Sequence, residues 1–149
     1  MKSLVLLAIM SNILAAGCDK TTTKINTPIE SISNISYGSD AKQVYDIFLP
    51  VARNSQSTKV MFLFHGGSWS GGDKRDFNFY IDSLKTYLPG YAFVNANYRL
   101  ANYGDNKFPT QENDIKAVIN HVLNKSGDYN ISKNIVMVYK RLISLNCYA

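Results

Sequence analysis

Short runs of apolar residues recur along the chain and predict five strands. Five consecutive bulky apolar residues at positions 60–64 are typical of a strand that is buried on both faces, as in parallel sheets. The other runs are shorter and are bounded by turn residues such as Gly38 and Asp40. The predicted strands are residues 32–37, 44–48, 60–64, 91–95 and 135–138.

Apolar residues at helical spacing predict two helices between these strands. The first helix has its apolar residues at intervals of four, three and four, at Phe77, Ile81, Leu84 and Leu88. Asp73 is expected to cap it, and Pro89-Gly90 to end it. The apolar face of the second helix comprises Ile115, Val118, Ile119, Val122 and Leu123.

Thr110 is expected to cap the second helix and Gly127 to end it. A strand, a helix and a second parallel strand form a right-handed crossover unit that places the helix over one face of the sheet. The pattern therefore predicts an α/β fold: a mostly parallel sheet of about five strands with two crossover helices.

A glycine-rich segment follows the most apolar strand. Residues 65–74 read His-Gly-Gly-Ser-Trp-Ser-Gly-Gly-Asp-Lys, with four glycines within seven residues. Glycines allow a sharp turn and a close approach of the backbone to a ligand. Loops at the carboxyl ends of such strands are where α/β folds place their sites, and free N–H groups there can hold a developing oxyanion. The alternative interpretation is a glycine-rich turn before a helix.

The segment and its neighbours resemble a known family. His65-Gly66-Gly67, then Trp69 and Gly72-Asp73-Lys74, resemble the oxyanion loop of α/β-hydrolase carboxylesterases and lipases of the hormone-sensitive-lipase type. Further similar pieces stand in the same order within residues 35–138: Tyr45-Asp46-Ile47-Phe48-Leu49-Pro50, Asn97-Tyr98-Arg99-Leu100, Phe108-Pro109 and Asp114.

This resemblance implies ester hydrolysis and assigns roles to loop residues. The backbone N–H groups of Gly67 and Ser68 would form the oxyanion hole, and His65 and Gly66 would shape the loop. Arg99 would brace the loops beside the site, the alternative being a surface cation. The substrate in the complete family would be a small-molecule or polysaccharide-linked ester, and no cofactor is implied.

The resemblance stops where the nucleophile is expected. The last predicted strand should lead into Gly-x-Ser-x-Gly, but Arg141 stands in place of the serine, and Tyr139 and Ile143 stand in place of the glycines. The only later serine is Ser144, and His121 lies in the middle of the second helix, where a catalytic base is not expected. We therefore expect no nucleophile, acid or base in this chain.

These observations predict an N-terminal part of an α/β-hydrolase domain at residues 31–138 and a non-matching tail at 139–149. A frameshifted or prematurely ended reading frame would explain them, and such a chain would be inactive alone. The alternative is a non-catalytic lipid-anchored binding protein or an unstable remnant. Residues 135–138 would form an exposed sheet edge, so residues 31–149 are expected to aggregate or to pack loosely.

The N-terminus resembles a bacterial lipoprotein signal. Lys2 and an apolar stretch precede Ala15-Ala16-Gly17-Cys18, which predicts a signal peptide at 1–17, a lipid on Cys18 and a polar tether at 18–30. Ala15 departs from the larger aliphatic residue usual at its position. A membrane-spanning anchor is the rival, but the apolar run is short of about 20 residues. We expect a lipid-anchored envelope protein, with a secreted or periplasmic protein as the alternative.

Composition narrows the function classes. The hydrophobic fraction of 46% is ordinary for a folded domain. The net charge of +5 arises from 16 basic and 11 acidic residues, without a basic run longer than Lys140-Arg141, so a nucleic-acid partner is not expected. No cluster of Cys and His has the spacing of metal ligands, so no metal is expected, and lipidation of Cys18 would leave Cys147 as a lone thiol.

Overall fold

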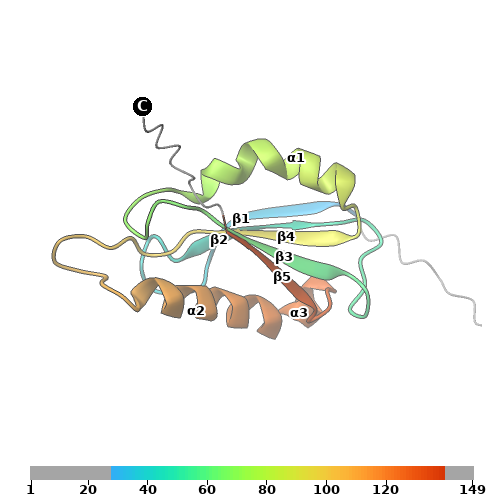
Figure 1. Cartoon of the computed structure of the whole chain (residues 1–149). Helices are drawn as coiled ribbons and strands as arrows, with labels where there is room; N and C mark the ends of the chain where they lie inside the picture. The colour runs from blue at the N-terminus through green and yellow to red at the C-terminus, as the bar shows by residue number, and fades with distance from the viewer. Residues whose placement is uncertain (1–27, 140–149) are drawn as a thin grey trace, which may run out of the picture.

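A five-stranded sheet forms the centre of residues 28–139, the part of the chain described by a computed structural model (Figure 1). The predictions for the signal peptide, Cys18, Arg141, Ser144 and Cys147 lie outside the described residues. The strands are β1 (Glu30–Ser36), β2 (Val44–Leu49), β3 (Lys59–Phe64), β4 (Tyr91–Ala96) and β5 (Ile135–Tyr139). The helices are the 3₁₀ helix η1 (Lys74–Phe77), α1 (Asn78–Tyr87), α2 (Thr110–Asn124) and α3 (Ser126–Tyr129).

The sheet is mixed, in the order β1-β2-β4-β3-β5. β3 runs parallel to both its neighbours, and Phe62 is in register with Val94 of β4 and Met137 of β5. β2 runs antiparallel to β4, and β1 runs antiparallel to β2. The α/β class, the five strands and the two crossover helices are thus confirmed, and β2 alone runs opposite to the other four strands.

Helices cover both faces of the sheet, α1 on one and α2 with α3 on the other (Figure 1). Alternate side chains of β3 enter the two cores. Phe62 and Phe64 pack in the larger cluster with residues of α2, and Met61 and Leu63 pack with Phe77 and Ile81 near α1. Residues 60–64 are all buried, which confirms the interpretation of this run as an inner strand.

The helix ends differ from the expectations for α2. Thr110 is the first residue of the helix, its cap is Pro109, and no side chain makes a capping hydrogen bond. Gly127 does not end α2, which stops at Asn124; the glycine lies inside α3. The residue that ends α3 is Asn130, which has left-handed backbone angles (φ 52°, ψ 50°). Asparagine tolerates this conformation better than most other residues do, which is why it can take the place of glycine here.

β5 is an edge strand within residues 28–139, where its partner is β3. Its residues Ile135, Val136 and Met137 are 38–48% exposed. A groove of about 260 Å³, here named the α1-side groove, is lined by Met61, Leu63, Phe77, Tyr80, Leu84 and Val138. The α2-side groove, of about 350 Å³, is lined by Trp69, Glu112, Ile115, Lys116, Ile119 and Met137. β5 therefore has an apolar groove beside it on each face of the sheet.

Candidate functional site

The glycine-rich loop leaves the carboxyl end of β3, the strand between β4 and β5. Gly67 and Gly72 have φ angles of 115° and 96°, in the region that glycine alone adopts easily. The carbonyl of Gly67 accepts hydrogen bonds from the N–H groups of Ser70 and Gly71, both at 3.0 Å. The loop is therefore a tight turn whose shape depends on glycine.

Two residues without this freedom also adopt left-handed angles. Ser68 has φ 51° and Trp69 has φ 67°, and the Trp69 carbonyl accepts a hydrogen bond from the N–H of Ala101 at 2.8 Å. Such conformations cost about 1–3 kcal/mol each and persist where the surrounding structure fixes them. Such strained conformations are frequent at ligand sites, so they support the interpretation that this loop has a function.

The amides of Gly67 and Ser68 have no acceptor in the described part of the chain: neither N–H donates a hydrogen bond to residues 28–139. Further along the loop, the N–H groups of Ser70 and Gly71 do donate. Two adjacent unpaired N–H groups at the carboxyl end of a central parallel strand are suited to hold a negatively charged oxygen. These are the two residues that the sequence predicts as oxyanion donors, and that role stays a prediction.

His65 lies beneath the loop and is only 3% exposed. Its ring stacks on Tyr98 with centroids 4.2 Å apart, and the Tyr98 hydroxyl donates to the His65 carbonyl at 2.8 Å. Nδ1 is 2.8 Å from the Gly66 carbonyl, which can only accept, so this nitrogen carries the proton. Burial lowers the pKa of His65 and raises the pKa of Tyr98 to about 12. His65 is thus a neutral ring packed under the loop.

A buried ion pair holds the far end of the loop. Lys74 Nζ contacts Asp46 Oδ2 of β2 at 2.5 Å, and both side chains are at most 10% exposed. The Lys74 backbone is held as well, because its N–H donates to Asn97 at 2.6 Å and its carbonyl accepts from Asn95 at 2.7 Å. Asp46 also accepts from the N–H of Asn34 at 2.8 Å. The signal in the sequence was a carboxylate inside an apolar strand, but nothing there indicated its partner.

Asp73 caps η1, as the sequence predicts for the start of this helical segment. Its Oδ1 accepts from the N–H of Arg75 at 3.1 Å, and its Oδ2 accepts from Asn97 at 3.1 Å. Burial alone would raise the pKa of Asp73, but hydrogen bonds from Arg75 and Asn97 outweigh it and hold the pKa well below its usual range. The cap is therefore ionised at neutral pH, where it stabilises the N-terminus of η1.

Arg99 is paired with Asp114 across the loop that joins β4 to α2. Its Nη2 lies 2.7 Å from Asp114 Oδ1 and its Nε 3.0 Å from Oδ2. Asp114 is 1% exposed and also accepts from Gln43 at 2.9 Å and from the Arg99 N–H at 2.9 Å. Burial alone would raise the pKa of Asp114, but these hydrogen bonds outweigh burial and lower it. This geometry fits the bracing role expected for Arg99.

His121 lies in α2, edge-on to Tyr45 with ring centroids 5.7 Å apart. Burial and the nearby Lys125 lower its pKa, and its buried Nε2 has no hydrogen-bond partner among the described residues. Within residues 28–139 no group of three or more His, Cys, Asp or Glu side chains is arranged to hold a metal ion. No helix in that part of the chain is long and apolar enough to span a bilayer.

The close approaches in the loop lead to a matched set of glycine variants. A Cβ at Gly67 would lie 2.2 Å from the Gly71 carbonyl oxygen, and one at Gly72 would lie 2.3 Å from the Gly66 oxygen. A Cβ at Gly71 would meet nothing closer than 3.8 Å. We expect Gly67→Ala and Gly72→Ala each to lower the free energy of unfolding by about 1–3 kcal/mol, and Gly71→Ala to be neutral or slightly stabilising. Urea denaturation measures this, and equal losses in all three would contradict the loop geometry.

Comparison with known proteins identifies the family of this chain. The family model BD-FAE matches residues 45–140, more than half of the 149 residues. No curated protein matches the chain. Among solved structures, a bifunctional GH43-CE protein from Bacteroides eggerthii is 30% identical with a TM-score of 0.60, over 73% of this chain and 15% of that one.

Two further structures are less similar in sequence. Esterase B from Lactobacillus rhamnosis is 22% identical with a TM-score of 0.61, over 74% of this chain and 35% of that one. A truncated form of a carbohydrate esterase from gut microbiota is 22% identical with a TM-score of 0.55, over 77% of this chain and 40% of that one.

The chain thus spans between 15% and 40% of the length of these three proteins. The matched part contains β2 to β5 with the glycine-rich loop between β3 and η1. These findings agree with the α/β class of the fold and with a resemblance to esterases. The chain belongs to the BD-FAE family, an esterase-like family with the α/β-hydrolase fold.

Proposed function

We propose that this chain is the N-terminal part of a serine carboxylesterase domain of the hormone-sensitive-lipase type. It builds the oxyanion side of the site and lacks the catalytic triad. The observation that carries the proposal is the pair of N–H groups at the carboxyl end of β3, on Gly67 and Ser68, that have no acceptor within residues 28–139. His65 and Gly66 shape the loop from below, and Arg99 braces the neighbouring segment through Asp114.

In the complete reaction, a serine oxygen attacks the ester carbonyl carbon and a histidine takes the serine proton. Two N–H groups hold the oxyanion until the alcohol leaves with that proton, and water then releases the acid from the serine. This chain supplies the N–H groups. Its two histidines do not serve as base, because His65 is packed under the loop and His121 lies against Tyr45 of β2.

The 149-residue chain alone is therefore expected to be inactive. Arg141 stands where the nucleophile belongs, and removing a single triad member from a serine hydrolase already costs several powers of ten in rate. We expect no hydrolysis of aryl esters above the buffer rate and no labelling by a serine-directed phosphonate. Esterase B, which has been solved with a tributyrin phosphonate bound, is the positive control. Stoichiometric labelling of any serine, including Ser144, would disprove the proposal.

The ester belongs to one of two classes, a small-molecule ester or an acyl group on a polysaccharide. The similarity to a carbohydrate esterase from gut microbiota favours the polysaccharide class. The second candidate function is a non-catalytic lipid-anchored binding protein, which the substitution at Arg141 favours. Binding of an acylated polysaccharide without turnover by the 149-residue chain would support this second function.

The lipid anchor is a separate proposal that rests on Ala15-Ala16-Gly17-Cys18. We expect cleavage before Cys18 and incorporation of labelled fatty acid into the mature chain, which holds it at the cell envelope. Cys18→Ala should abolish the label and release or misprocess the protein, whereas the matched variant Cys147→Ala should keep it. A wild-type chain found unlipidated in the soluble fraction would contradict this proposal.

A further inference from the structure

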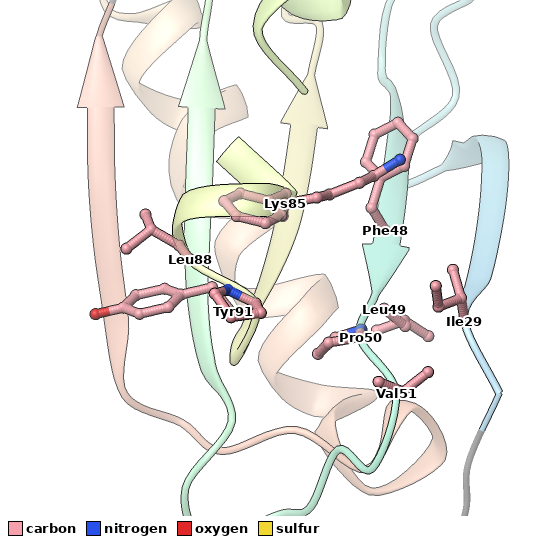
Figure 2. A pocket seen from close by; sticks show the side chains of 10 residues that line it. Ile29, Phe48, Leu49, Pro50, Val51, Lys85, Leu88 and Tyr91 are labelled. Carbon is pink, nitrogen blue, oxygen red and sulfur yellow. The ribbon is translucent and has the colours of Figure 1, made fainter. Parts of the chain in front are cut away.

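An apolar cavity lies at the end of the sheet away from the glycine-rich loop. It has a volume of about 120 Å³ and lies where β2 ends and β4 begins (Figure 2). Leu49, Pro50 and Val51 line it from one side and Leu88 and Tyr91 from the other. This is also the end where the chain enters β1, since Ile29 is part of the lining.

Two exposed apolar side chains line this cavity, and a third directly precedes a lining residue in the sequence. Ile29 is 69% exposed and Val51 is 51% exposed. Tyr87, at the end of α1 beside Leu88, is 82% exposed. Together with the cavity they form a surface that we name the entry face, defined by Ile29, Val51, Tyr87, Leu88 and Tyr91. Tyrosines with an apolar ring and a polar tip are typical of the interface between a bilayer and water.

Lysines border the entry face. Lys59 begins β3 and lies over the Tyr91 ring at 5.8 Å, and Lys85 lies over the Phe48 ring at 4.5 Å. Lys133 is exposed and precedes β5, at the same end of the parallel strands. Glu30 is paired with Arg53 at 2.8 Å, and Asp82 lies 3.4 Å from Lys85. After these pairs are counted, Lys59 and Lys133 stand against one exposed carboxylate at this end of the sheet, Asp128 of α3, and the end remains positive.

The positive charge around the entry face distinguishes between the partners that could bind it. A second copy of the chain placed face to face would bring lysines against lysines, which is unfavourable. An anionic bilayer surface would bind both the lysines and the apolar side chains of the entry face. Each lysine near the headgroups contributes about 1 kcal/mol of binding free energy, and the apolar side chains enter the boundary between headgroups and acyl chains. The described part of the chain begins at Pro28, ten residues after Cys18. Ten residues of fully extended chain span at most about 35 Å. A bilayer holding Cys18 would therefore be within reach of the face.

We propose that the entry face is a docking surface for anionic phospholipid bilayers, which turns the glycine-rich loop away from the membrane. The inference rests on the cavity, the exposed apolar residues and the lysine border. It requires neither ester hydrolysis nor acylation of Cys18, so it can fail or succeed independently of the proposed function.

The test uses the full chain with Cys18→Ser and Cys147→Ser, so that no lipid is attached and one introduced cysteine carries an environment-sensitive fluorophore. The label is placed at Val51→Cys on the entry face. The matched control is Phe79→Cys, which is 86% exposed at the opposite end of α1. With vesicles of phosphatidylethanolamine and phosphatidylglycerol, we expect a blue shift and an intensity gain at position 51 and none at 79.

Charge is tested in the same assay. Lys59→Gln together with Lys133→Gln should weaken vesicle binding about 30-fold, because each lysine contributes about 1 kcal/mol. Phosphatidylcholine vesicles should give no shift. The proposal is overturned if the chain does not bind, if position 51 stays in water while the chain binds, if both labels respond equally, or if charge has no effect.

Discussion

Replacing Lys74 by methionine should lower the free energy of unfolding by about 3–5 kcal/mol. The substitution keeps most of the apolar stem but removes the ammonium group that contacts Asp46, and it leaves a carboxylate that is 10% exposed without its cation. The remaining hydrogen bond to Asp46, from the Asn34 N–H, is too weak to replace the ion pair. The expected result is a large decrease in the urea midpoint of the dilute protein, followed by circular dichroism.

Two variants separate this effect from the loss of any lysine. Lys42 pairs with Asp73 at 3.5 Å on the surface, with 47% of its side chain exposed, so Lys42→Met should cost less than about 1 kcal/mol. The double variant Lys74→Met with Asp46→Leu should recover part of the loss, because replacing both members of a buried pair by apolar residues is often tolerated. Equal costs for Lys42→Met and Lys74→Met would show that the pair does not hold the loop.

Placing a lysine on β5 should make the chain less prone to associate. In the wild type, Ile135, Val136 and Met137 are exposed on an edge strand, and an apolar groove flanks the strand on each face. An open apolar edge is a template for pairing with another chain. We expect the wild-type chain to sediment as concentration-dependent oligomers and to bind a hydrophobic dye. Val136→Lys should weaken association about ten-fold, because apposed lysines repel and the apolar contact is lost.

The control is Ser33→Lys, which adds the same charge to β1, the opposite edge of the sheet. β1 is already polar and largely exposed, so this variant should associate like the wild type. Sedimentation over a range of concentrations distinguishes the two edges. A wild-type chain that remains monomeric at every concentration and does not bind the dye would contradict the prediction.

Most of the fold was accessible from the sequence because each strand has a distinctive local pattern. The run at 60–64 has no polar residue, so it could only be an inner strand, and β3 indeed lies between β4 and β5. The crossover helices followed from the spacing of Phe77, Ile81 and Leu84. These are local signals, and tertiary contacts reinforced them.

The parts that were missed depend on contacts between distant residues. Asp46 and Lys74 are 28 positions apart, and the strand order β2-β4-β3 brings the Lys74 side chain of η1 within reach of Asp46 on β2. Gly127 looked like a helix end, but α2 stops three residues earlier and a second short helix follows, ended by Asn130. For the candidate site, the identity of the loop was predictable from its glycines, whereas the packing of His65 on Tyr98 required the structure.

Amide hydrogen exchange followed by NMR shows directly whether the N–H groups of Gly67 and Ser68, which have no acceptor within residues 28–139, are free to hold an oxyanion. We expect the amides of Gly67 and Ser68 to exchange at rates close to those of an unprotected peptide. Two amides should be protected: that of Gly71 in the same loop, which donates to the Gly67 carbonyl, and that of Ala101 between β4 and α2, which donates to the Trp69 carbonyl. Protection of Gly67 and Ser68, or equal exchange at all four amides, would contradict this expectation.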